Sequence, residues 1–168
     1  SGFSYETKTV DRRQNLRGRS SAIQLPFFDD FTESDVYPDV SKWQSNDVLV
    51  NSGFPVFPTN YNAATLDILD VTGKVYSNAS SSPFIADSLI SNPISLKELT
   101  LADSVYFSFY YQPQGNGDAP EAADSLVLMF GCKTDTTLVW NHIWSTEGVT
   151  LDSFLLANDG NYFKQVMI

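Results

Sequence analysis

Residues 103–112, Asp-Ser-Val-Tyr-Phe-Ser-Phe-Tyr-Tyr-Gln, restrict the possible folds of this chain more than any other segment. Apolar side chains occupy every second position, which is the period of a β-strand and not the 3.6-residue period of a helix. One face would carry Val105, Phe107, Phe109 and Tyr111, and the other Tyr106, Ser108, Tyr110 and Gln112. An apolar strand face has to be covered by a second layer, so the pattern predicts a layered β-protein.

Short strand-like runs separated by turn residues recur along the rest of the chain. They are residues 23–31, 48–50, 63–69, 124–130, 138–144 and 162–168. Pro55 and Pro58 interrupt regular structure after the second run, and a loop rich in Gly and Pro spans residues 113–120. The only helical pattern, residues 94–101, is short. The sequence therefore predicts an all-β, antiparallel β-sandwich.

Composition agrees with this fold class. Aromatic residues make up 14% of the 168 residues, and charged residues only 18%, which is low for a helical protein with solvated faces. A chain of this length can form one domain with a sizeable core. We expect one β-sandwich domain over residues 23–168, preceded by an extended basic arm or linker over residues 1–22.

Charge divides the chain into two unequal parts. Residues 1–22 hold four arginines and one lysine against two acidic residues, a net charge of +3, whereas the remainder holds five lysines against 18 acidic residues, a net charge of −13. An acidic body repels nucleic acid and anionic membranes, so we expect neither as its partner. No run approaches the roughly 18 apolar residues of a membrane-spanning helix.

The two ends suggest a piece of a longer protein. Ser1-Gly2 is not a native start, and residues 162–168 alternate like a strand after which the chain stops. We therefore expect the sandwich to be incomplete at its C-terminus.

Several short strings occur in order along the chain. The set begins with Phe27-Phe28-Asp29-Asp30-Phe31, Tyr37-Pro38-Asp39 with Lys42-Trp43, and Ala64-Thr65-Leu66-Asp67-Ile68-Leu69-Asp70. It continues with Phe109-Tyr110-Tyr111-Gln112-Pro113-Gln114-Gly115, Gly117-Asp118-Ala119-Pro120-Glu121 and Asp124-Ser125-Leu126. It ends with Trp140-Asn141, Ile143-Trp144 and Phe163-Lys164-Gln165-Val166.

Over residues 26–168 this set resembles the N-terminal region of large exported proteins of Bacteroidota, bacteria with type IX secretion and gliding motility. Its layout is also similar to MAM and cleaved-adhesin domains. These resemblances imply a concanavalin-like jelly roll and an extracytoplasmic location: at the cell surface, associated with the outer membrane, or secreted. The acidic closing strand of those domains is missing here, which weakens the case for calcium binding by their pattern.

Residues suited to catalysis are scarce. The chain has one histidine, His142, and one cysteine, Cys132, and residues 23–168 contain no arginine. No Gly-x-Ser-x-Gly string, phosphate-binding loop or zinc-ligand spacing is present. A single cysteine also excludes a disulfide within the chain. We therefore expect a non-enzymatic protein without a cofactor.

Calcium is the one metal that the sequence leaves open. Asp29 and Asp30 are hard oxygen donors beside a predicted strand, and such donors are what calcium uses. The alternative is that they are solvated turn carboxylates that bind their own backbone. We take Asp29 and Asp30 as the candidate calcium ligands.

Aromatic residues give the candidate ligand or partner surface. Tyr106 and Tyr110 share a strand face with Gln112, and Trp144 is a further aromatic candidate for stacking on a ligand. The alternative is that the aromatic side chains form the core. Three Asp-Ser-aliphatic strings match the pattern on which Bacteroidota O-glycosylate exported proteins, which makes Ser88, Ser104 and Ser125 candidate glycosylation sites.

Two functions of different classes follow. The first is a protein-interaction or structural domain of an exported cell-envelope or cell-surface protein, a component or cargo of the type IX secretion and gliding machinery, with other envelope proteins as partners. The second is a carbohydrate-binding or adhesive jelly-roll module with glycans as ligands. We prefer the first, because the sequence shows no concentrated sugar-binding motif.

Overall fold

The computed structural model describes residues 22–44, 47–70, 72–77, 79, 84–133 and 137–168. In these residues the chain forms β1 (Leu49–Asn51), β2 (Ala63–Thr65), the 3₁₀-helix η1 (Leu101–Asp103), β3 (Ser108–Tyr111), β4 (Ser125–Lys133), β5 (Leu138–Glu147), α1 (Leu151–Ala157) and β6 (Lys164–Met167). The strands pair as three two-stranded sheets, β1–β2, β3–β6 and β4–β5, all antiparallel. The prediction of a mainly-β protein is confirmed. A jelly roll needs roughly eight strands in two sheets, so it stays a prediction.

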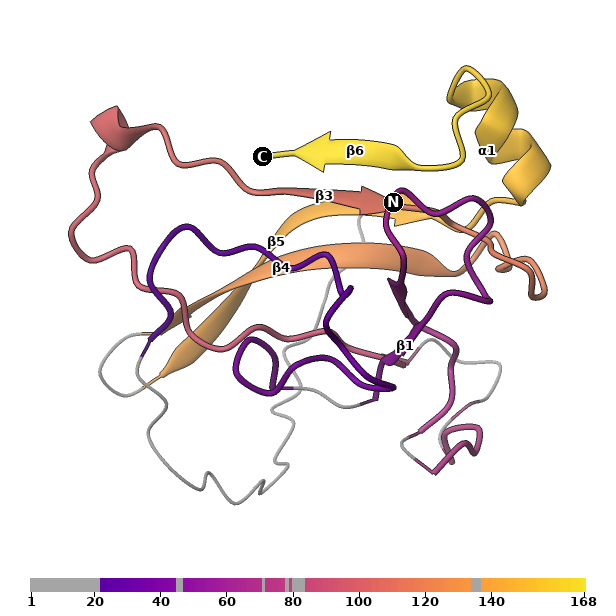
Figure 1. The fold of residues 1–168 in the computed structure, drawn as a ribbon, viewed down its shortest axis with the longest axis horizontal. Helices are drawn as coiled ribbons and strands as arrows, with labels where there is room; N and C mark the ends of the chain where they lie inside the picture. Colours follow the sequence, from indigo (N-terminus) through magenta and orange to yellow (C-terminus); the bar gives the residue numbers. More distant parts are fainter. Residues whose placement is uncertain (1–21, 45–46, 71, 78, 80–83, 134–136) are drawn as a thin grey trace.

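The β4–β5 hairpin is the most extended element of the fold (Figure 1). Its register runs from Ser125 opposite Glu147 to Lys133 opposite Leu138. Leu128 lies opposite Trp144, but the next residue, Met129, lies opposite His142, so Ile143 is one residue inserted into β5. The bulge is therefore on β5, and β4 is regular throughout.

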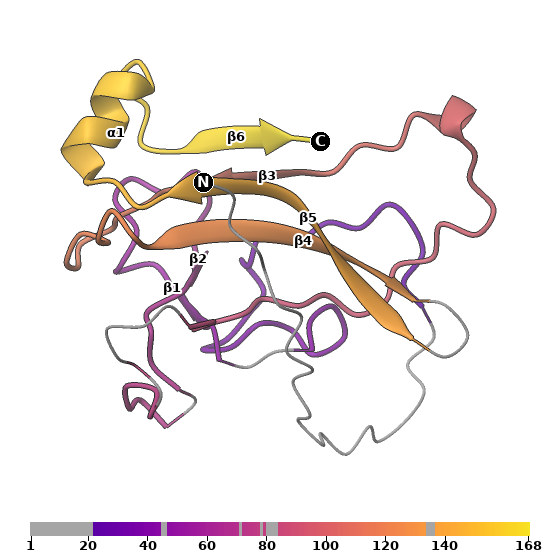
Figure 2. The same cartoon turned by 180° about the vertical axis from the view of Figure 1, so that it is seen from behind.

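β3 pairs with β6 although more than fifty residues of sequence separate them. Phe109 lies opposite Val166, and the ladder continues beyond both strands because Phe107 N donates to Ile168 O at 3.2 Å and Ile168 N to Phe107 O at 2.9 Å. Figure 1 shows β3 and β6 side by side above the hairpin. Figure 2 shows the same arrangement from behind, with α1 leading from the end of β5 to β6.

Aromatic rings join the β4–β5 hairpin to the β3–β6 pair. Trp144 of β5 meets Phe109 and Tyr111 of β3 at ring-centroid distances of 5.5 and 5.3 Å. Phe107 meets Phe130 of β4 at 5.7 Å, and all three contacts are edge-on. Edge-on aromatic pairs at this distance are favourable beyond the area that they bury. These side chains, which we call the inter-sheet cluster, hold the hairpin against the β3–β6 pair.

Several predicted strands are shorter than expected. The strand predicted for residues 103–112 covers only 108–111, because Asp103 ends η1 and Ser104 has a left-handed backbone with φ of 49°. Within the part of the chain that the structure describes, residues 23–31 form no strand, and Ile23 makes an isolated bridge with Ile94. The run at 63–69 ends at Thr65, since Ile68 has a φ of 63°.

A helix that the sequence analysis did not predict follows the hairpin. Thr150 caps α1, because Ser153 N donates to Thr150 Oγ1 at 3.3 Å, and Asp152 lies in the first turn, where a carboxylate is favourable. Phe154 of α1 is buried and meets Tyr111 at 5.5 Å, which extends the inter-sheet cluster to this helix. Among the described residues, no helix is long and apolar enough to cross a membrane.

Candidate functional site

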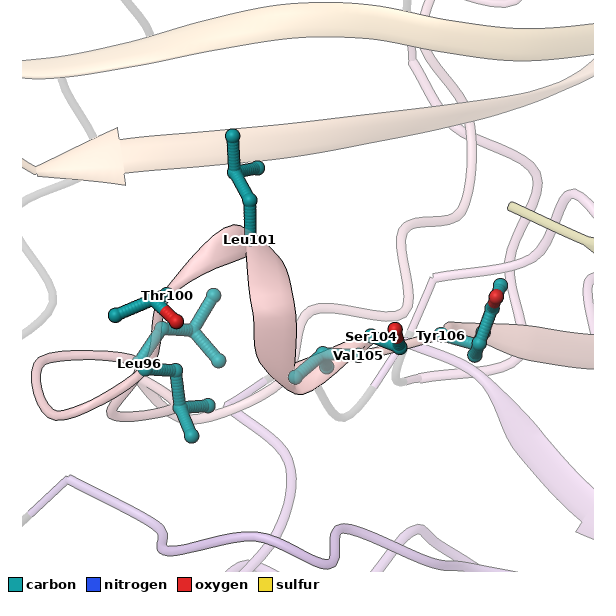
Figure 3. Close-up of a pocket in the computed structure, with 7 residues that line it drawn as sticks. Leu96, Thr100, Leu101, Ser104, Val105 and Tyr106 are labelled. Carbon is teal, nitrogen blue, oxygen red and sulfur yellow. The ribbon is translucent and has the colours of Figure 1, made fainter.

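An open hollow lies beside η1, where the chain turns towards β3 (Figure 3). Thr100 and Asp103 hold the turn, because the backbone N–H and hydroxyl of Thr100 donate to Asp103 Oδ2 at 2.7 and 2.8 Å. These hydrogen bonds also lower the pKa of Asp103. The carboxylate of Asp103 therefore stabilises the turn. The left-handed Ser104 then redirects the chain towards β3.

The side chains around this η1 hollow are mostly apolar and strongly exposed. The hollow measures about 570 Å³ and is lined by Leu96, Leu99, Thr100, Leu101, Ser104, Val105 and Tyr106. Each of its leucines is exposed, and Leu101 of η1 is fully so. An apolar patch of this kind is typical of a surface that another molecule covers. Sequence analysis missed the three leucines, because it treated residues 94–101 only as a short helical pattern.

Tyr106 and Tyr110 connect the hollow to the outer face of β3. Tyr106 is 71% exposed and Tyr110 is 54% exposed, whereas Phe109 between them lies in the inter-sheet cluster. The predicted division of faces is therefore confirmed for residues 106–111. We call Tyr106, Tyr110 and the residues of the η1 hollow the tyrosine face.

The structure does not bring Gln112 and Trp144 onto the tyrosine face. Gln112 accepts from Val56 N at 2.9 Å and donates to Val56 O at 2.9 Å and to Tyr162 O at 3.0 Å. Its amide therefore joins two loops within the body of the protein. Trp144, predicted for the same surface, lies between the two β-layers in the inter-sheet cluster.

Asp29 is held by protein donors. Its Oδ1 accepts from Phe31 N at 3.0 Å and from Lys42 Nζ at 3.2 Å, and its Oδ2 accepts from Trp43 Nε1 at 2.6 Å. The ring of Trp43 in turn meets Phe27 edge-on at 5.4 Å and stacks on Phe31 at 5.8 Å. Lys42 is thus paired with Oδ1, one of the two oxygens with which Asp29 would bind a metal.

Asp30 lines a second open hollow, of about 310 Å³, together with Asp29, Glu33 and Lys42. Its Oδ1 accepts from Thr32 N at 3.0 Å, and this hydrogen bond lowers the pKa of Asp30. Asp30 therefore has the geometry of a turn carboxylate that binds its own backbone, which is the alternative to a calcium ligand. Among the described residues, no group of three or more His, Cys, Asp or Glu side chains could hold a metal ion. Calcium binding stays an untested prediction.

The three candidate glycosylation serines lie in different environments. Ser104 lines the η1 hollow and is exposed, Ser125 is exposed at the start of β4, and Ser88 is half-buried. The aspartate before each serine binds a backbone N–H group: Asp87 that of Ile68 at 2.8 Å, Asp103 that of Thr100 at 2.7 Å and Asp124 that of Glu121 at 2.8 Å. A local structural role therefore accounts for each aspartate.

Asp87 is the one described carboxyl group whose pKa is raised. Burial raises it, while hydrogen bonds from Tyr76 Oη at 2.7 Å and Ile68 N at 2.8 Å oppose the rise and the charge of Asp67 adds to it. A carboxyl group with a raised folded-state pKa is protonated more readily in the folded protein than in the unfolded chain. Protonation of Asp87 therefore stabilises the fold.

We expect the wild type to gain stability relative to Asp87→Asn as the pH falls. The stabilising contribution is complete below the ordinary pKa of 3.8 and is lost as the pH rises through the raised folded-state value. Urea unfolding of both proteins between about pH 7 and pH 3.5 measures the difference. Asp70→Asn is the control with the opposite sign, because hydrogen bonds from Thr72 and Lys74 lower the pKa of Asp70. Parallel pH curves for wild type and Asp87→Asn would contradict the argument.

The histidine and the cysteine lie on the same hairpin but apart. Cys132 lies opposite Val139 and His142 opposite Met129, three register steps along the ladder. Asn141 Nδ2 approaches Cys132 Sγ at 3.7 Å. The register therefore does not pair the two side chains across the strands as a nucleophile and its base would require.

Comparison with known proteins adds no relative. No protein-family model, no curated protein and no solved structure matches the chain.

Proposed function

We propose that this chain is a non-enzymatic protein-interaction domain of an exported cell-envelope or cell-surface protein, built on a jelly-roll sandwich. Its tyrosine face would bind another envelope protein, and the parent protein would be a component or cargo of type IX secretion and gliding. The extracytoplasmic location rests on the resemblance of residues 26–168 to exported Bacteroidota proteins. The binding role rests on the geometry of β3.

The observation that supports binding most strongly is the exposure of Tyr106 and Tyr110 beside the exposed leucines of the η1 hollow. Tyrosine buries a large ring area at low entropic cost, and aromatic residues are enriched at protein interfaces. Because Phe109 and Tyr111 of β3 are anchored in the inter-sheet cluster, Tyr110 projects from a strand whose position is held, and Tyr106 lies two residues before that strand. A preorganised aromatic surface of this kind suits a protein partner.

A glycan ligand is the second candidate. Thr100 and Ser104 place hydroxyl groups at the η1 hollow beside the ring of Tyr106. Sugar rings combine an apolar face with hydroxyl groups, so an aromatic side chain next to polar groups can bind them. The three leucines of the hollow favour the protein partner, because they supply apolar area without hydrogen-bonding groups.

The experiment is a mild-detergent pull-down of the full-length native protein from its source envelope, with bound proteins identified by mass spectrometry. We expect stoichiometric capture of an envelope or secretion protein, and loss of that protein in the double variant Tyr106→Ser/Tyr110→Ser. Tyr61→Ser is the matched control, because Tyr61 is also exposed, at 72%, but lies in the loop before β2. Capture that survives the double variant would remove the tyrosine face from the proposal.

Recovery of the protein alone would favour the glycan candidate. Purified protein would then be titrated with soluble cell-surface polysaccharide from the same source. Binding that is lost in Tyr106→Ser and kept in Tyr61→Ser would assign the hollow to a sugar.

A further inference from the structure

The described chain begins beside the η1 hollow. Ile23 makes a parallel bridge with Ile94, and Ser95 N donates to Ile23 O at 2.8 Å. The residue after Ser95 is Leu96, which lines the hollow. In Figure 1 the described chain starts next to the segment that leads to η1. Residues 1–21, which form the basic arm of the sequence analysis, lie outside the described residues and join the fold at this point.

The last residues of the arm are suited to a reversal of the chain towards the hollow. Because the bridge at Ile23 is parallel, continuing its register sets Leu25 alongside Leu96. A two-residue turn at Ser20-Ser21, residues of a type that turns favour, sets Leu16 opposite Leu25. The shortest reversal of the arm therefore brings Leu16 to the side of the hollow that Leu96 lines.

The arm is complementary to this region in charge. Its arginines surround Leu16, and residues 12–22 contain no acidic residue: the arginines are Arg12, Arg13, Arg17 and Arg19. The body of the chain, residues 23–168, has a net charge of −13. Beside the hollow, the exposed Glu98 and Asp103 outnumber the exposed Lys97. Attraction between the arginines and these carboxylates favours the arm over an acidic segment as the occupant of the hollow.

We propose that residues 12–20 of the arm dock at the η1 hollow, with Leu16 among the three leucines and the arginines towards the acidic rim. The covalent connection at Ile23 keeps the arm at an effective concentration in the millimolar range, so a modest affinity suffices. A partner of the tyrosine face then has to displace the arm. This regulation rests on the proposed function, whereas the docking itself does not.

Disulfide trapping in the full-length chain tests the docking. Asn15→Cys leaves Leu16 in place, Leu101→Cys puts a thiol at a fully exposed position of the hollow, and Cys132→Ser removes the native thiol. The chain is equilibrated in a glutathione buffer, and the fraction with an intramolecular disulfide is read by intact mass. We expect that fraction to give an effective concentration about tenfold above that of the control pair.

Val40→Cys replaces Leu101→Cys in the control pair. Val40 is 84% exposed, and its carbonyl accepts from Asn92 Nδ2 at 3.0 Å. Asn92 precedes Pro93, whose carbonyl accepts from Ile23 N at 2.8 Å. Val40 therefore also lies near the point where the arm joins the fold, so an undocked arm would reach either cysteine.

Leu16→Ser should lower the trapping at Leu101 to the level of the Val40 pair. Raising the salt concentration should lower it as well, because salt screens the attraction between the arm and the body. Gln14→Ser is the matched control and should leave trapping unchanged, since Gln14 is a polar residue of the same segment. Equal trapping at Leu101 and Val40, or trapping at Leu101 that Leu16→Ser leaves unchanged, would overturn the docking.

The partner pull-down separates this inference from the proposed function. If the arm docks, Leu16→Ser should raise capture of the envelope protein at low salt. Preferential trapping at Leu101, together with capture that Tyr106→Ser/Tyr110→Ser leaves intact, would support the docking and remove the proposed function. Equal trapping at the two positions, with capture lost in that double variant, would remove the docking and support the proposed function.

Discussion

Trp144→Ala should lower the free energy of unfolding by about 3 kcal/mol, the lower end of the usual cost of removing a large aromatic side chain from a core. Trp144 contacts two rings of β3, Phe109 at 5.5 Å and Tyr111 at 5.3 Å, and these contacts hold the hairpin against the β3–β6 pair. Their loss leaves a cavity between two layers that share no strand. Urea unfolding followed by far-UV circular dichroism measures the change.

Trp140→Ala is the matched control for this prediction. Trp140 lies on the same strand, but it is exposed and packs over Gly131 of β4, with ring carbon Cζ3 2.9 Å from the position that a Cβ would take there. We expect it to cost about 1 kcal/mol, since less of its surface is removed from water. Equal losses for the two variants would show that the inter-sheet cluster does not hold the layers together.

Asp29→Ala should produce the second large effect, a loss of about 3 kcal/mol in the free energy of unfolding. The side chain of Asp29 is only 5% exposed, and it accepts hydrogen bonds from Phe31 N, Lys42 Nζ and Trp43 Nε1. Removing the carboxylate leaves the backbone N–H of Phe31, the indole N–H of Trp43 and the ammonium group of Lys42, whose side chain is 32% exposed, without this acceptor. The same urea titration measures the loss, and Trp43 fluorescence should shift because its hydrogen bond is broken.

The variant Asp29→Asn separates the charge of Asp29 from its hydrogen bonds. Asp29→Asn keeps an acceptor for Trp43 but removes the ion pair with Lys42, so we expect about half of the alanine effect. Asp35→Ala is the control, since Asp35 is an exposed aspartate of the following loop. If Asp29→Ala were no more harmful than Asp35→Ala, the Asp29–Lys42–Trp43 arrangement would contribute no stability.

The predictions that held depend on local pattern. The two-residue period of residues 106–111 determined which side chains face inwards, because neighbouring residues of any strand point to opposite faces. Apolar runs bounded by turn residues located β4 and β5 to within a few residues, because β4 is a nearly continuous apolar run and β5 is rich in β-branched and aromatic residues. Helix α1 was missed because seven residues are too few to show a helical period, although Thr150 and Asp152 were present as start signals.

The candidate site was predicted only in part, and for a physical reason. Gln112 follows the alternation of its strand, yet its amide is bound by Val56 and Tyr162, residues that are distant in sequence and that no local pattern identifies. Asp29 was likewise predicted as a metal ligand from its own chemistry. Its actual partners, Lys42 and Trp43, come from a turn that brings them against it.

The sequence by itself determined the mainly-β class of this protein, the inward and outward faces of β3, and an acidic body poor in catalytic groups. These properties follow from residue period and composition, which are local or additive. Only the tertiary structure decided that β3 pairs with β6, that Trp144 lies between the layers, and that the leucines around η1 meet Tyr106 in one hollow. Such contacts join residues far apart in the chain, and they are selected by which apolar faces and backbone edges can cover one another.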